Sequence, residues 1–321
     1  KFKPGQVLYV TRRGYLRKCG IVDTEGICSN VTFAMEADET KFLQSLLPFL
    51  MQTENFVEHA TSNAHGSTNP FLNWKDIAKY EFLLPPLEDQ KKISEVLWEV
   101  ENNVSGMESY IDKIKRIKSK LQVSLLNTGK KISVKEITSE HKQGFYFNEG
   151  YNNGGVYLVR ITDLENPNIN FTSMPKIRIS DKDYEQFKVL EGDFLIARSG
   201  AIGRYGIYKS ENKAVFGSYI IRFRFDGKKI IPGYFGQLFS SKICSKQLKV
   251  ISQSSANVNI NAENIKKLII PLPSLEQQQS ILSKLEIFDK LIENSMKHLS
   301  ALKSLRNKLS NELLKGDLRL K

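Results

Sequence analysis

Two short glycine-bearing segments carry the side chains of this sequence with the clearest chemistry. They contain the basic and polar residues Arg12, Arg13, Arg17 and Lys18 in one segment, and Arg198, Ser199 and Arg204 in the other. A guanidinium group donates two parallel hydrogen bonds to guanine O6 and N7, or it pairs with a phosphate oxygen. The alternative is a solvated basic turn. Because such a turn occurs twice, we favour contact with DNA, more with phosphate than with bases.

Polar loops with small donors and acceptors form a second set of candidate DNA-binding residues. They are His65, Ser67, Thr68 and Asn69; Gln253, Ser254, Ser255 and Asn257; and Gln143, Tyr146, Asn152 and Asn153. Asn and Gln side chains suit adenine edges, and Ser and Thr suit phosphate or base. The alternative for the first two loops is helix N-capping, which Asn73 and Asn261 are able to perform themselves. Arg160 and Asp163 are expected to pair with each other.

The sequence offers no motif for catalysis, nucleotide binding or metal binding. It lacks G-x-x-x-x-G-K-[ST] and G-x-G-x-x-G, and its four histidines are scattered without ligand spacing. The stretch Thr68–Phe71 resembles the Asn-Pro-Pro-Phe signature of adenine methyltransferases, but the second proline is absent. We therefore predict no catalytic residue, no metal site and no cofactor bound by this chain.

The overall composition fits a basic, soluble protein of more than one domain. The chain has 321 residues, a formal charge of +12 and no run of about 18 apolar residues. The positive charge favours a polyanionic partner such as nucleic acid. Three separate cysteines without a C-x-x-C pair fit a reducing cytoplasm, and no membrane segment is expected.

An internal repeat organises the chain. LPPLEDQKKI (84–93) returns as LPSLEQQQSI (272–281), and positions 46–126 align with 234–314 at an offset of 188. Upstream, TRRG meets ARSG and CGIV meets YGIY at an offset of 186. About 60 residues before Gly192 have no counterpart before Gly5, so we expect the sequence to begin partway through its first repeat. The chain is a tandem duplication.

Each repeat divides into a strand-rich block and a long helix. Short β-branched and aromatic runs such as DFLIARSG predict strands, and a helix is expected around 42–56 and again around 233–248. The prolines of the repeated phrase place the start of each long helix near Leu87 and Leu275. Gly129 and Gly316 mark the helix ends.

The long helices carry apolar residues at alternating spacings of three and four, which is a heptad seam. Its members include Leu97, Val104, Ile111, Ile114 and Leu121, and Leu285, Ile292, Leu299, Leu302 and Leu309. One polar step, Lys118 or Arg306, recurs at the same place. Each helix would be about 55–60 Å long. The two helices of one chain are expected to pair as an antiparallel coiled coil; a homodimeric coiled coil is the alternative.

These motifs together resemble the specificity subunit of type I restriction–modification systems. The resemblance rests on the two Pro-Leu-Glu-x-Gln phrases, on GSTNPFLNWKDI and SSANVNINAENI, on the two hairpin segments, and on VYLVRITDL. It implies an α+β, pseudo-twofold tandem repeat in which strand-rich target recognition domains alternate with two spacer helices. The corresponding parts are 1–82 (recognition domain 1, carboxyl-terminal part only), 83–128, 129–269 (recognition domain 2) and 270–321.

The resemblance also implies the function and the partners. Such a subunit of the prokaryotic cytoplasm reads a bipartite double-stranded DNA target with a fixed gap. It docks methyltransferase subunits, which bring S-adenosylmethionine, and a translocase/nuclease subunit, which uses ATP and Mg for cleavage. A specificity subunit of a type IIB-like enzyme is an alternative that the sequence leaves open. An alternative of another class is a coiled-coil adaptor that binds protein instead of DNA.

Overall fold

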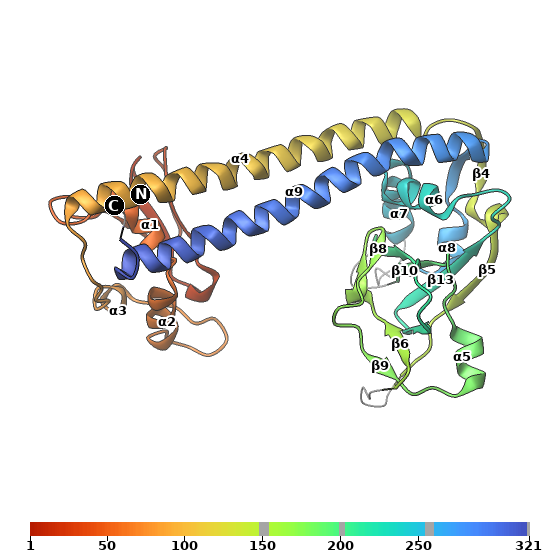
Figure 1. Ribbon diagram of the computed structural model, residues 1–321, viewed down its shortest axis with the longest axis horizontal. Helices are drawn as coiled ribbons and strands as arrows, with labels where there is room; N and C mark the ends of the chain where they lie inside the picture. The colour runs from red at the N-terminus through yellow and green to blue at the C-terminus, as the bar shows by residue number, and fades with distance from the viewer. Residues whose placement is uncertain (148–153, 199–202, 254–259, 320–321) are drawn as a thin grey trace. The chain divides into compact units, whose positions relative to one another are not determined.

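The chain folds into two units, each with a strand-rich part and segments of two long helices. The computed structural model describes residues 1–147, 154–198, 203–253 and 260–319. One unit contains Lys1–Asp112 and Glu293–Lys321, and the other contains Lys113–Ile292. Helices α4 (Leu87–Leu125) and α9 (Leu275–Lys315) each contribute to both units (Figure 1). The expected α+β class is confirmed, and both long helices begin where the proline-rich phrases predicted.

The first unit is built around a three-stranded antiparallel sheet in the order β2-β1-β3. Its elements are β1 (Val7–Val10), the 3-10 helix η1 (Gly14–Leu16), β2 (Cys19–Ile21), β3 (Thr32–Met35), η2 (Gln44–Leu46), α1 (Leu47–Leu50), α2 (Glu54–Ser62) and α3 (Trp74–Ile77). Val7, Tyr9 and Phe56 lie in the core between the sheet and α2.

The second unit is larger and contains a four-stranded sheet in the order β11-β10-β13-β5 and a three-stranded sheet in the order β12-β6-β9. Its strands are β4 (Lys130–Ser133), β5 (Thr138–Gln143), β6 (Val156–Val159), β7 (Leu164–Glu165), β8 (Asn168–Ile169), β9 (Lys176–Ile177), β10 (Phe194–Ala197), β11 (Tyr205–Ile207), β12 (Ala214–Phe216), β13 (Ile220–Phe225) and β14 (Ile269–Leu272). Its helices are η3 (Val134–Ile137), η4 (Ile161–Asp163), α5 (Asp181–Phe187), α6 (Pro232–Ser240), α7 (Lys242–Gln253) and α8 (Ala262–Lys266).

The helix expected around 42–56, like the one around 233–248, is broken into separate helices. In the first unit Thr53 ends one turn and starts the next: its hydroxyl donates to the carbonyl oxygen of Leu50 and accepts from the amide of Phe56. Ser241 does the same in the second unit, donating to Leu238 and accepting from Ile243. Because a hydroxyl competes with the backbone for hydrogen bonds, these residues favour caps over helix interiors.

The two sheets repeat the same strand order, with one difference from the expected alignment. β1 and β10 begin at Val7 and Phe194, which are 187 positions apart, whereas β2 and β11 begin at Cys19 and Tyr205, 186 apart. The connection between the strands is therefore one residue longer in the first unit. Residues at the end of β1 and β10 are related by an offset of 187, so the alignment of TRRG with ARSG at 186 is wrong by one residue. Arg198 therefore corresponds to Thr11 of the first unit.

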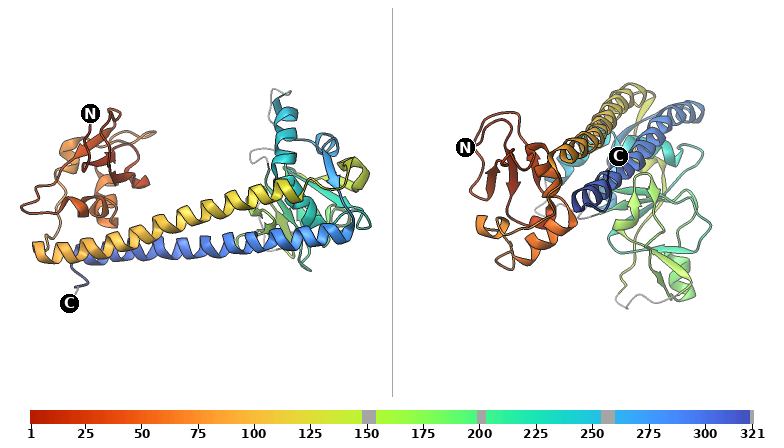
Figure 2. Two further views of the ribbon diagram at one scale, coloured as in Figure 1. Left: turned by 90° about the horizontal axis from the view of Figure 1, so that it is seen from above. Right: turned by 60° about the vertical axis from the view of Figure 1, so that its left-hand side comes forward.

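Segments of α4 and α9 lie side by side in each unit (Figures 1 and 2). In the first unit Leu97, near the start of α4, packs in one cluster with Leu313, near the end of α9. In the second unit Leu121, near the end of α4, packs with Leu285, near the start of α9. The paired segments therefore run in opposite directions. Of the ten seam residues, Leu97, Val104, Ile111, Ile114 and Leu285 are buried, and Leu121, Ile292, Leu299, Leu302 and Leu309 are half-buried.

The recurring polar step of the seam forms an ion pair in each unit. In the second unit Lys118 pairs with Asp289, and in the first Arg306 Nη1 lies 2.9 Å from Glu101 Oε2. Lys118 and Arg306 are 188 positions apart, and so are Glu101 and Asp289. Each helix thus supplies one cation and one anion at equivalent places.

A buried glutamine explains why the proline-rich phrase is written twice. In the first unit Gln90 Nε2 donates to the carbonyls of Lys41 and Pro85, and Gln90 Oε1 accepts from the amide of Leu43. In the second unit Gln278 makes the three equivalent bonds, to Lys229, Pro273 and Ile231. Both side chains are fully buried. We call each of these a glutamine clamp; it fastens the strand-rich part to the first turn of a long helix.

A charged cluster in the second unit should make stability depend on pH. Burial raises the pKa of Glu140, but the charges of Arg222 and Arg224 outweigh that effect and hold its pKa below the ordinary value. The stabilising contribution of Glu140 is therefore present above the unfolded-state pKa, about 4.5, and is lost as pH falls through the lower folded-state pKa.

We expect Glu140→Gln to lower the unfolding temperature at pH 7. As the pH falls from 5 to 3, the difference in unfolding temperature between this variant and the wild type should shrink progressively. Differential scanning calorimetry at several pH values measures this gap. A gap of constant size over that range would contradict a role for the charge.

Candidate nucleic-acid interface

The structure joins two of the predicted DNA-binding segments in the first unit. The β1–β2 connection and the loop 65–71 meet through a backbone bridge between Arg12 and Phe71 and a hydrogen bond from the Arg13 amide to the Pro70 carbonyl, 2.8 Å long. The Arg13 Nη2 atom also donates to Asn69 Oδ1 at 2.7 Å. We call this surface the first basic face; its exposed members are Arg12, Arg13, Lys18, Ser67, Thr68 and Asn69.

Two further residues predicted to bind DNA, Arg17 and His65, form side-chain contacts within the first unit. Arg17 donates to the Gln52 carbonyl at 2.9 Å and to Glu54 Oε2 at 2.6 Å, and its hydrogen bond lowers the pKa of Glu54. His65 Nε2 lies 2.9 Å from Asp76 Oδ2, in the capping box that starts α3. Both side chains therefore support the loops that carry the first basic face.

The helix N-caps are supplied by the asparagines named in the sequence, so the neighbouring polar loops are not needed for capping. Asn73 forms a capping box with Asp76, whose pKa is lowered chiefly by the hydrogen bond from the Asn73 amide. Asn261 accepts from the Asn264 amide at 2.8 Å at the start of α8. Ser67, Thr68 and Asn69 thus remain exposed.

In the second unit, predicted residues from two distant segments line one hollow. It has a volume of about 460 Å³, and its walls are His141, Lys142, Gln143, Arg198, Ile221, Asn261, Ala262 and Glu263. Gln143 ends β5, and Arg198 follows β10; the amide of Ile260 donates to the Arg198 carbonyl at 2.9 Å and so brings the α8 segment to the same place. We call this surface the second basic face.

Sequence reasoning missed Lys142 and Asn261 as members of the second basic face. Lys142 stands directly before Gln143, but the sequence does not show that β5 and β10 pair with the two sides of β13 and so belong to one sheet. Asn261 was recognised as a cap alone. Lys142 became a candidate through its strand pairing with Arg222, 80 positions away, and Asn261 through the backbone bond between its neighbour Ile260 and Arg198.

The remaining predicted residues are spread over the second unit. Tyr146 is 71% exposed, and Arg204 is exposed with its Nη1 atom 3.5 Å from the Ile161 carbonyl. Gln253 is the last residue of α7. Asn152, Asn153, Ser199, Ser254, Ser255 and Asn257 lie outside the described residues. The pairing of Arg160 with Asp163 is confirmed at 2.8 and 3.0 Å.

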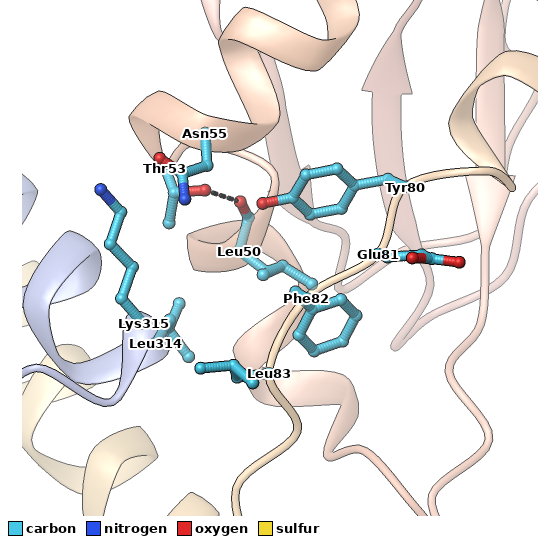
Figure 3. Close-up of a pocket in the computed structure, with 9 residues that line it drawn as sticks. All are labelled: Leu50, Thr53, Asn55, Tyr80, Glu81, Phe82, Leu83, Leu314 and Lys315. Atoms are coloured by element: carbon cyan, nitrogen blue, oxygen red, sulfur yellow. Dashed lines mark hydrogen bonds between the residues drawn. The ribbon is translucent and has the colours of Figure 1, made fainter.

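A separate pocket of about 330 Å³ lies in the first unit, where the chain enters α4 (Figure 3). It is lined by Leu50, Thr53, Asn55, Tyr80, Glu81, Phe82, Leu83, Leu314 and Lys315. The Tyr80 hydroxyl points toward Leu50 and Thr53, and Leu83 lies beside Leu314 (Figure 3). Leu83 is 71% exposed, and Leu84 is 51% exposed. The entry to α4 therefore presents an apolar surface, which we call the apolar elbow (Phe82, Leu83 and Leu84).

The described residues show neither a metal centre nor a membrane helix. No group of three or more His, Cys, Asp or Glu side chains among them is arranged to hold a metal ion. Within the same part of the chain, every helix is too short or too polar to cross a membrane.

Comparison with known proteins identifies the family. The model of the type I restriction modification DNA specificity domain matches residues 5–116 and 128–304. The type I restriction enzyme MjaVIII specificity subunit of Methanocaldococcus jannaschii is 25% identical over 92% of this chain and 75% of its own length. The EcoBI specificity subunit of Escherichia coli is 29% identical over 41% of this chain and 28% of its own.

A solved structure has the same fold. The crystal structure of the S subunit of a type I restriction–modification system from M. genitalium superposes with a TM-score of 0.59 over 98% of this chain and 84% of that chain, at 14% identity. The family match covers most of the chain. The chain therefore belongs to the type I restriction–modification DNA specificity family and is a DNA specificity subunit, the non-catalytic component of such a complex.

Proposed function

We propose that this specificity subunit reads a bipartite double-stranded DNA target, one half with the first basic face and the other with the second. The observation that carries the proposal is the convergence of Gln143 and Arg198 on one hollow. A glutamine amide and an arginine fork are side chains that form paired hydrogen bonds with adenine and guanine edges. Lys142, in the same wall, suits the phosphates that flank those bases.

We further propose that the paired α4 and α9 helices set the gap between the half-targets. A continuous helix of 39 residues, as in α4, is about 58 Å long. Because one turn of DNA measures about 34–36 Å, readers held apart by such a helix contact half-targets more than one turn apart. The base pairs between them would be uncontacted.

The apolar elbow and the pocket beside it are the proposed dock for a methyltransferase subunit. Leu83 and Leu84 expose apolar area in the first unit, and Lys315 at the end of α9 adds a cation to the pocket wall. In the prokaryotic cytoplasm the methyltransferase would bring S-adenosylmethionine. A translocase/nuclease subunit using ATP and Mg would join for cleavage.

Alanine in place of Arg198 tests the DNA-reading proposal. We expect the complex with its methyltransferase to bind its target about 5- to 150-fold more weakly, the effect of losing one paired base contact, and to tolerate more bases at one position. Target sequences are found first by mapping methylated bases in the host genome, and affinities are then measured by gel shift.

The matched control is Lys290→Ala, which removes one exposed positive charge from α9 in the same unit. It should weaken binding equally on target and unrelated DNA and leave the base preference unchanged. If Arg198→Ala gives the same uniform loss, Arg198 contacts phosphate alone. If the wild-type complex shows no sequence preference, the proposal fails as a whole.

A further inference from the structure

We propose that Tyr15 and Leu16 form an apolar wedge that enters a step between base pairs in the half-target read by the first unit. This inference rests on the proposed function, because it takes DNA as the partner of the first basic face. Both residues belong to η1, within the β1–β2 connection. Tyr15 is 50% exposed, and Leu16 is 47% exposed.

The surroundings of the two side chains favour DNA as the partner. Single exposed apolar residues are common on protein surfaces and need no partner. Here, however, two of them stand together in a turn that also carries exposed Arg12, Arg13 and Lys18. Cations on both sides suit the phosphates of a duplex, and an apolar tip between them suits the stacked bases. Proteins that kink DNA use such apolar side chains between base steps.

The backbone of the turn is held in an unfavourable conformation, which is typical of functional sites. Arg13 has φ 54° and ψ 59°, and Arg17 has φ 53° and ψ 35°, so both lie in the left-handed region. Side chains other than glycine adopt this region at a cost, and surrounding contacts have to maintain it. The two arginines enclose Gly14, Tyr15 and Leu16.

Contacts from several elements fix the turn. The Leu16 amide donates to the Arg13 carbonyl at 2.8 Å, and the Arg17 amide donates to the Gly14 carbonyl at 3.0 Å. At Gly14 a Cβ atom would lie 3.0 Å from the Tyr9 hydroxyl and 3.3 Å from Ala60 Cβ, so the turn packs tightly on β1 and α2. The Arg17 guanidinium, bound to Gln52 and Glu54, secures the other end.

This rigidity is what a wedge requires. Separating stacked base pairs costs free energy, and a tip on a loose loop would fold aside instead of entering the step. The hydrogen bonds of Arg17 to Gln52 and Glu54 therefore serve DNA binding indirectly, because they hold Leu16 in place. Arg17 is a positioning residue in this account, and Leu16 with Tyr15 is the group that touches the bases.

The proposal predicts an asymmetric target. The connection of the second unit, residues 198–204, is one residue shorter, and its sequence, RSGAIGR, has no aromatic residue. Distortion is therefore expected at one step in the half-target read by the first unit.

The test uses the assembled complex with its methyltransferase and a target duplex with 2-aminopurine placed in turn at each adenine of both half-targets. The methylated adenines and their direct neighbours are left out, because a methyltransferase itself turns its target base out of the stack. The fluorescence of 2-aminopurine rises when the base loses its stacking partner. In the wild type we expect a rise at one step in one half only. Leu16→Ser and Tyr15→Ser should abolish the rise and weaken specific binding about tenfold, since the distorted duplex is no longer held.

The control is Ile27→Ser, which removes an apolar side chain that is 82% exposed in the same unit. It should leave both the fluorescence and the affinity unchanged. Specific binding by the wild type without any rise in fluorescence overturns the wedge and leaves the proposed function standing. If the wild-type complex binds DNA without sequence preference, the proposed function itself is wrong. If the serine variants lose the methyltransferase in the absence of DNA, the tip is a protein contact and the wedge is excluded.

Discussion

Lysine in place of Asp289 is expected to lower the free energy of unfolding of the second unit by about 3 kcal/mol. The Asp289 carboxylate accepts from Lys118 and, at 2.7 Å, from Gln237 Nε2, and Gln122 Nε2 donates to Gln237 Oε1 at 3.1 Å. These bonds join α4, α9 and α6. Breaking a buried pair costs about 3–5 kcal/mol. We expect the lower end, because Asp289 remains 29% exposed. Chemical denaturation followed by circular dichroism measures the change.

The exchanged double variant separates charge from packing. Lys118→Asp combined with Asp289→Lys restores opposite charges across the helices, so it should recover a large part of the loss. Lys284→Asp, at an exposed position on α9, is the matched single reversal and should change stability by less than about 0.5 kcal/mol. A double variant as unstable as the sum of its single variants would show that the ion pair does not hold the helices together.

Alanine in place of Arg222 is expected to lower the free energy of unfolding by about 3–5 kcal/mol. The side chain is 1% exposed, lies over the Phe216 ring, and pairs with Glu140 and with the Lys188 carbonyl. Its removal leaves a cavity and an acceptor at Lys188 without that donor. Thermal and chemical unfolding of the purified protein measure the loss.

Two further variants show where that loss originates. Arg222→Met keeps most of the volume and the apolar contact with Phe216, so it isolates the polar part and should cost less than alanine. Arg224→Ala removes a neighbouring cation that is 25% exposed and pairs with the same Glu140 and with Asp193. It should cost less than Arg222→Ala. A larger loss for Arg224 would mean that its closer pairing with Asp193, at 2.8 Å, matters more than the contacts of Arg222, whose Nε lies 3.8 Å from the same carboxylate.

The features of the fold that depend on local pattern followed from the sequence. Proline placed the starts of α4 and α9 at Leu87 and Leu275, and the heptad spacing identified which faces of these helices lie together. The polar steps at Lys118 and Arg306 were recognised as positions, but their partners were not. Glu101 and Asp289 stand among many other acidic residues on the helices, and only the register of the pair brings them opposite the cations.

Features that depend on long-range pairing were harder to predict. The one-residue difference between the hairpin connections leaves no mark in the composition of TRRG and ARSG, and the structure reveals it through strand register. Thr53 and Ser241 looked like ordinary helix residues, although their hydroxyl groups end one helix and begin another. Small polar residues carry too little periodic signal to show this.

The candidate site was predicted by residue type more than by location. Arg12 and Arg17 were both predicted to contact DNA, yet Arg17 is bound to Glu54 and Gln52, and no local pattern separates it from exposed Arg12. Lys142 and Asn261 join the second basic face through strands that meet far from them in sequence. Side-chain chemistry thus indicated the kind of partner, and tertiary contacts decided which members of each cluster are free to meet it.

The glutamine clamps allow the strand-rich parts of this protein to change in sequence without losing their attachment to the long helices. Gln90 and Gln278 bond to main-chain atoms alone. The glutamine clamps therefore do not depend on which side chains stand at Lys41, Leu43 and their counterparts. A substitution there by any residue except proline, which lacks the backbone N–H, keeps the donors and acceptors of these bonds. The globular part can therefore accumulate mutations, and with them new sequence preferences, while its attachment to the helix keeps the same geometry.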